Sequence, residues 1–215
     1  MKKVAVIIFI SSLILGLAAC DKTPTGPVAI VNGVEITREA FDSELEYDLE
    51  YFNSQGMTLT DQELAEVKQN VVDRLINTHL LKEAALKAGI NADTVDVDGE
   101  LATIMESFED EADFEQALAE ADFTLESYKQ VLADMLMIEA LFEQELELSK
   151  IEVGEEEIEA MIASYLEYYG EEDDIDEEDL REYAIYVLKE RKIESLRFEY
   201  LEKLRGESDI EYLDF

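Results

Sequence analysis

Apolar residues recur at three- and four-residue spacing along most of this chain, which is the period of an amphipathic α-helix. Three predicted helices begin at residues with N-cap chemistry, namely Thr37, Thr60 and Thr124, and Thr60 also opens a capping box that closes at Glu63. The pattern predicts four long helices, over residues 37–55, 60–88, 124–148 and 180–204.

Shorter apolar stripes predict three further helices. One begins near Asp98 as its N-cap and turns Leu101 and Phe108 inward, a second covers 114–121, and a third covers 155–169. Gly206 is expected to end the last long helix.

The two ends of the predicted domain depart from the helical period. Two short apolar runs surround Asn32-Gly33 within residues 28–36, which is a strong β-hairpin signal. Residues 210–213 are a candidate terminal strand. We therefore predict a mainly α, multi-helix domain over residues 28–215, with a small β element formed by the N-terminal hairpin and the C-terminal strand. Helices 37–55 and 60–88 are expected to pack with helices 124–148 and 180–204.

The first nineteen residues have the organisation of a secretory signal peptide. Lys2 and Lys3 precede an apolar stretch that is shorter than the ~20 residues a membrane-spanning helix needs. The run Leu17-Ala18-Ala19-Cys20 then resembles a bacterial lipobox, which implies cleavage before Cys20 and lipid on Cys20. Residues 20–27 would form a lipidated tether. The alternative is an ordinary signal peptide followed by a free thiol.

The composition is strongly acidic, with a formal net charge of −37. Removal of residues 1–19, which hold Lys2 and Lys3 and no acidic residue, makes it −39. Nucleic acid and anionic lipid surfaces require basic patches, so we expect no nucleic-acid partner and membrane contact only through the lipid anchor. The acidity indicates either a solvated shell suited to high salt or attraction of basic clients.

Three stretches carry a family resemblance: VAIVNGVEIT (28–37), LINTHLLKEAALKAGI (75–90) and YLEKLR (200–205) leading to Ile210. In their order and spacing the chain resembles the SurA/PrsA-type extracytoplasmic chaperones, whose helical domain is related to that of trigger factor. The resemblance implies an ATP-independent holdase without a cofactor, for unfolded or nascent proteins of the envelope and outer membrane.

Members of that family commonly insert a parvulin prolyl-isomerase domain after the segment that matches 155–169. Only residues 170–179 follow here before the next predicted helix, and a domain needs ~50 residues or more. We therefore expect no isomerase domain and no enzymatic activity. The resemblance transfers no catalytic residue.

Other candidate chemistry is sparse. His79 is the single histidine and lies on an apolar stripe, where we expect it to pack rather than act as a base. Residues 96–99 echo part of a calcium-binding EF-hand loop, but the first and last ligand positions lack carboxylates, so a helix cap is preferred and no metal site is predicted.

Methionine and tyrosine gather in the middle helices. Core packing explains many of them, but Met is also suited to adaptable apolar binding. Tyr168 and Tyr169 are adjacent and cannot both face one core. Our candidate client-binding residues are Met135, Met137, Met161, Tyr165 and Tyr168.

These observations predict a lipid-anchored chaperone of the cell envelope that binds apolar and aromatic client segments. The alternative is a structural or adaptor lipoprotein subunit of an envelope complex, which would co-purify with one partner at fixed stoichiometry.

Overall fold

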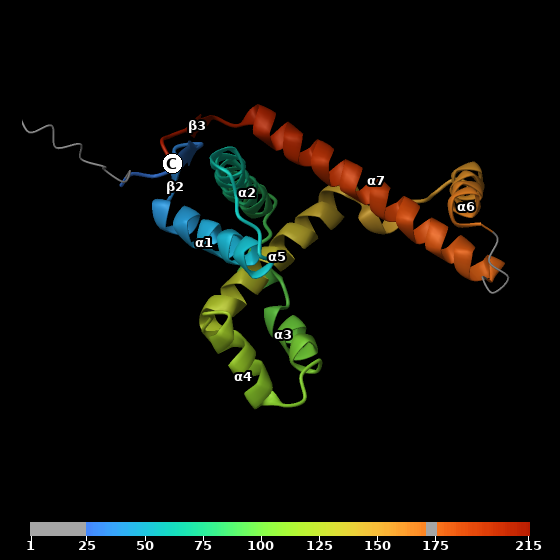
Figure 1. Cartoon of the computed structure of the whole chain (residues 1–215), viewed down its shortest axis with the longest axis horizontal. Helices are drawn as coiled ribbons and strands as arrows, with labels where there is room; N and C mark the ends of the chain where they lie inside the picture. Colours follow the sequence, from blue (N-terminus) through green and yellow to red (C-terminus); the bar gives the residue numbers. More distant parts are fainter. Residues whose placement is uncertain (1–24, 171–175) are drawn as a thin grey trace, which may run out of the picture.

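The computed structural model describes residues 25–170 and 176–215. Over these residues the chain forms seven α-helices, two short 3₁₀ helices and one three-stranded sheet, which confirms the mainly α prediction (Figure 1). The helices are α1 (Arg38–Ser54), α2 (Asp61–Lys87), η1 (Ala92–Thr94), α3 (Val97–Met105), α4 (Glu111–Glu120), α5 (Leu125–Leu146), η2 (Leu148–Lys150), α6 (Glu155–Tyr169) and α7 (Glu177–Glu207).

The sheet joins the beginning and the end of the described chain. β1 (Ala29–Val31) lies between β2 (Val34–Ile36) and β3 (Ile210–Tyr212), and both pairings are antiparallel. Asn32 and Gly33 both have positive φ, at 51° and 82°, as the two-residue hairpin turn requires. The predicted hairpin and terminal strand are thus confirmed.

The largest apolar core lies between this sheet, α1 and α2. Its fully buried side chains include Val31, Phe41 and Ile76. α2 is the central helix, since it packs against α1, α5 and α7. A second core joins α2 and α5 through Leu81 and Leu141 and receives apolar side chains from the C-terminal half of α7.

α3 and α4 form a separate lobe on the N-terminal half of α5 (Figure 1). Leu101, Phe114 and Leu132 make its small core. We predicted Asp98 as the N-cap of α3, but the N-cap is Asp96, two residues earlier. The carboxylate of Asp96 accepts the backbone N–H of Gly99, at 2.9 Å, whereas Asp98 forms an ion pair with Lys129.

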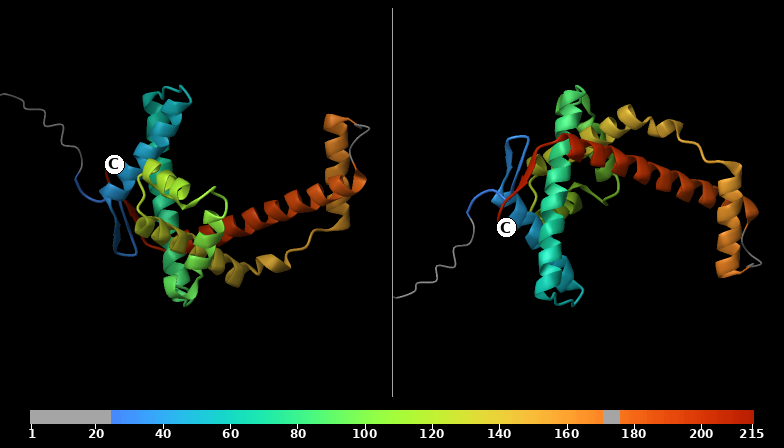
Figure 2. Two further views of the ribbon diagram at one scale, coloured as in Figure 1. Left: turned by 90° about the horizontal axis from the view of Figure 1, so that it is seen from below. Right: turned by 90° about the horizontal axis from the view of Figure 1, so that it is seen from above.

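The N-terminal half of α7 extends away from the rest of the molecule as a long arm. α6 packs across the outer end of this arm (Figure 2). Arg197 fastens the arm to α5, since its guanidinium donates to both carboxylate oxygens of Glu139 and lies 5.2 Å from the centre of the Phe142 ring.

The bounds of α7 differ from the prediction at both ends. It begins at Glu177 rather than at residue 180, because the Asp176 carboxylate accepts the backbone N–H of Glu178 and acidic residues suit a helix N-terminus. Gly206 lies inside the last turn, and the helix ends after Glu207 because Ser208 adopts an extended backbone. The predicted acidic run over 171–179 therefore falls partly in α7 and partly in 171–175, outside the described residues.

Candidate functional site

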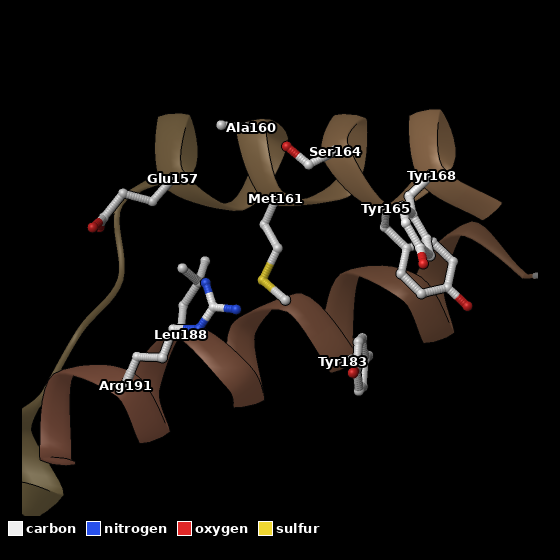
Figure 3. Close-up of a pocket in the computed structure, with 9 residues that line it drawn as sticks. All are labelled: Glu157, Ala160, Met161, Ser164, Tyr165, Tyr168, Tyr183, Leu188 and Arg191. Carbon is white, nitrogen blue, oxygen red and sulfur yellow. The ribbon is translucent and has the colours of Figure 1, made fainter. Parts of the chain in front are cut away.

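A groove of about 430 Å³ lies where α6 crosses the outer part of α7 (Figure 3). Most of its wall is apolar or aromatic. The lining residues are Glu157, Ala160, Met161, Ser164, Tyr165 and Tyr168 of α6, with Tyr183, Leu188 and Arg191 of α7.

α6 and α7 pack against each other, and each of them buries apolar side chains. Ile158 of α6 and Leu180 and Ala184 of α7 are buried, and none of the three belongs to the main apolar cores. At the α6 N-terminus the Glu157 carboxylate accepts the backbone N–H of Gly154, at 2.8 Å. This bond satisfies one of the free donors of the first helical turn and fixes where α6 begins.

Ion pairs add to this contact on both sides of the crossing. Lys192 donates to the Glu157 carboxylate at 2.7 Å and to the carbonyl oxygen of Glu152 at 3.2 Å, and Arg181 donates to Glu155. The Lys192 hydrogen bond holds the pKa of Glu157 below its usual value, and Arg181 does the same for the pKa of Glu155. All four side chains are substantially exposed, so these pairs orient α6 more than they stabilise the fold.

The two ends of the groove differ in chemistry (Figure 3). Glu157 and Arg191 lie at one end, and Met161 points from α6 towards α7 in the middle. At the other end the rings of Tyr165 and Tyr183 meet edge to face, with centroids 6.2 Å apart. Tyr168 is 81% exposed and Tyr183 is 51% exposed, so this end presents aromatic surface to solvent.

Comparison with known protein families identifies the chain. The sequence model of the SurA-like N-terminal domain matches residues 1–142, about two thirds of the chain. The chain belongs to this family. SurA-like N-terminal domains are chaperone modules of the cell envelope, which agrees with the resemblance found in the sequence. No curated protein matches the chain.

The matched residues of this SurA-like protein end within α5, so the groove lies beyond them. The chain passes from α6 to α7 through residues 170–176, too short a segment to hold a domain. No helix within 25–170 or 176–215 combines the length and apolarity needed to cross a bilayer.

Three of the five candidate client-binding residues come together in the groove, namely Met161, Tyr165 and Tyr168. Met135 is 62% exposed but lies on α5, one helical turn after the exposed Val131, and does not line the groove. For Met137 the prediction was wrong: its side chain is 4% exposed and belongs to the core between α2 and α5.

Sequence reasoning missed Tyr183, Leu188 and Arg191. They belong to α7, whose weak amphipathic pattern does not reveal which face meets α6. The exposed Tyr186 on the same helix does not line the groove, so aromatic character alone could not have selected Tyr183.

Two further residues that the sequence analysis considered are Cys20 and His79. Cys20 is outside the described residues. His79 is half-buried on α2, and its Nε2 atom is buried without a hydrogen-bond partner. Within the described part of the chain, no three His, Cys, Asp or Glu side chains gather in a way that could hold a metal ion.

Proposed function

We propose that this protein is a lipid-anchored, ATP-independent holdase of the cell envelope. It binds apolar and aromatic segments of unfolded proteins in the groove between α6 and α7. The observation that carries the proposal is the exposed Met- and Tyr-lined groove at the far end of an arm, in a chain of a chaperone family.

The chemistry of the groove supports loose, varied binding. Met161 is unbranched and polarisable and can fill differently shaped spaces, while tyrosines offer large rigid rings with a polar tip. Burial of such a wall against a client needs no nucleotide, since removal of apolar surface from water is favourable by roughly 25 cal/mol per Å². No reaction is required of any residue in the groove.

The place of the groove in the molecule suits an anchored protein. The described chain begins beside the sheet, and the α6–α7 groove lies at the opposite end of the molecule (Figure 1). A lipidated Cys20 would hold the sheet end near the membrane and leave the groove directed away from it. Cys20→Ala should therefore release the protein into the soluble envelope fraction. If the variant still partitions fully with membranes, the lipid assignment is wrong.

The groove is tested by measuring how well the protein suppresses the aggregation of several unrelated unfolded proteins. Light scattering is the readout. Tyr168→Ser should weaken suppression several-fold while the free energy of unfolding changes by no more than about 0.5 kcal/mol, as at other surface sites. Tyr186→Ser is the matched control, because Tyr186 is 63% exposed on α7 but does not line the groove.

Equal activity of the wild-type protein and the folded Tyr168→Ser variant would place client binding elsewhere. A wild-type protein that suppresses no aggregation and co-purifies with one partner at fixed stoichiometry would support the adaptor alternative.

A further inference from the structure

The tyrosine end of the α6–α7 groove lies in the most acidic region of the chain. Among the described residues from Glu155 to Lys192, eleven are Asp or Glu and only four are Lys or Arg. Two of the four bases are already occupied, since Arg181 pairs with Glu155 and Lys192 pairs with Glu157. The local excess of negative charge therefore remains largely uncompensated.

The two other bases do not neutralise the tyrosine end. Arg191 enters the groove from the end opposite the tyrosines, and its guanidinium lies beside Leu188 in Figure 3. Lys189 is exposed and does not line the groove. Exposed carboxylates lie next to the tyrosines in sequence, since Glu167 precedes Tyr168 in α6 and Glu182 precedes Tyr183 in α7.

The tyrosine rings themselves offer a surface for a cation. Tyr165 and Tyr183 are inclined by 67° to each other, so they present ring surface in two directions around one hollow, and Tyr168 lies beside them (Figure 3). The face of an aromatic ring attracts a Lys ammonium or Arg guanidinium placed within about 6 Å of its centre.

We propose that the tyrosine end of the groove binds the cationic side chain of a client, so that segments carrying Lys or Arg beside apolar residues are preferred. The inference rests on the proposed function, because it concerns the same groove. The apolar part of the segment lies along Met161 and Leu188. The ammonium or guanidinium group lies among Tyr165, Tyr168 and Tyr183.

The experiment measures binding of three fluorescent peptides that differ at one central position, Lys, Gln or Glu, between identical Leu and Phe residues. The purified protein should bind the Lys peptide about two- to five-fold more tightly than the Gln peptide, as expected for an exposed cation–π contact. The Glu peptide should bind most weakly. A Glu peptide that binds more tightly than the Gln peptide would assign selectivity to Arg191 and overturn the proposal.

Variants of Tyr183 distinguish a cation–π contact with its ring from attraction of the peptide by the acidic surface as a whole. Tyr183→Leu keeps an apolar wall and should abolish the preference for Lys over Gln, whereas Tyr183→Phe keeps the ring and should retain it. Tyr186→Leu is the control outside the groove and should behave as wild type. Melting curves check that each variant folds, which is expected because Tyr183 is half exposed.

Measurement in ~1 M NaCl removes long-range attraction, because the Debye length falls to ~3 Å. A preference for Lys that survives this salt and disappears in Tyr183→Leu supports the site. A preference that disappears in salt and is unchanged in Tyr183→Leu would assign it to the acidic surface alone. If the wild-type protein binds none of the peptides, the proposed function fails; if it binds Gln and Lys equally, only this inference fails.

Discussion

Met135 and Met137 are two residues apart on α5 and have opposite surroundings. An α-helix turns by roughly 100° per residue, so side chains two positions apart point to nearly opposite faces. Met135 is exposed, while Met137 fills the core that joins α2 and α5. The same residue type therefore has different roles within one turn of a helix.

This pair provides a matched test of packing. Met137→Ala should lower the free energy of unfolding by about 2–5 kcal/mol, because it removes a buried side chain and leaves a cavity. Met135→Ala should change it by no more than about 0.5 kcal/mol. Denaturant titration measures both values. A small loss for Met137→Ala would mean that the core relaxes into the vacated space.

Asp73 is the centre of a polar cluster that joins α2 to the C-terminal segment. Its carboxylate accepts from the Tyr212 hydroxyl and from the Arg205 guanidinium, which also donates to Asn77. Partial burial acts to raise the pKa of Asp73, but hydrogen bonds from Gln69, Tyr212 and Arg205 outweigh it and hold this pKa below the ordinary value.

A lowered pKa in the folded state means that the ionised Asp73 stabilises the fold above its unfolded-state pKa of ~3.9 and ceases to do so as the pH falls through the folded-state pKa. Asp73→Asn should therefore lower the free energy of unfolding at neutral pH by about 1–2 kcal/mol, a figure reduced for partial exposure. The difference from wild type should shrink below about pH 4. Urea titrations at several pH values measure it, and a difference that is constant with pH would contradict the role of the carboxylate charge.

At the scale of elements, α6 and α7 are consecutive helices that pack against each other, and only residues 170–176 separate them in sequence. Their crossing builds the groove from side chains that are far apart in the sequence, such as Met161 and Leu188. The short connection here leaves the two helices in direct contact.

The connection leads to a prediction about catalysis. The purified protein should not accelerate isomerisation of a proline-containing peptide, which then proceeds at its uncatalysed rate of tens to hundreds of seconds at 25 °C. A parvulin enzyme assayed in parallel serves as the positive control. Acceleration that grows with the concentration of this protein would contradict the assignment.

At the scale of the whole molecule, the net charge of −37 opposes the compact state. Ion pairs such as Arg74 with Glu44 and Lys129 with Asp98 are exposed and offset little of this repulsion. The arm of α7 and the α3–α4 lobe also give the molecule an extended shape with limited core (Figure 2).

Stability should therefore depend on salt. The Tm is expected to rise between dilute buffer and ~1 M NaCl, most steeply below 0.1 M, because the Debye length falls from ~30 Å at 0.01 M to ~10 Å at 0.1 M. Calorimetry at several NaCl concentrations measures it, with an uncharged osmolyte as the control. A Tm that does not change with NaCl would mean that local structure already compensates the acidic residues.

The sequence by itself determined the elements of this fold and the family. The starts of α1, α2 and α5 follow from Thr37, Thr60 and Thr124, whose side chains cap their own helices, and Asn32-Gly33 specifies the hairpin. These are local interactions, complete within a few residues, so the pattern of the chain is sufficient to predict them.

Only the tertiary structure decided which faces of the helices meet. Met161 lies on the apolar stripe of its helix and Met137 lies off the main stripe of its own, but the packing of α5 against α2 buried Met137, and the crossing of α6 over α7 left Met161 in a groove. Tyr183 and Tyr186 are alike in sequence and differ because α6 covers one side of α7. Such contacts join residues distant in the chain, and their geometry depends on how whole helices cross, which no local pattern encodes.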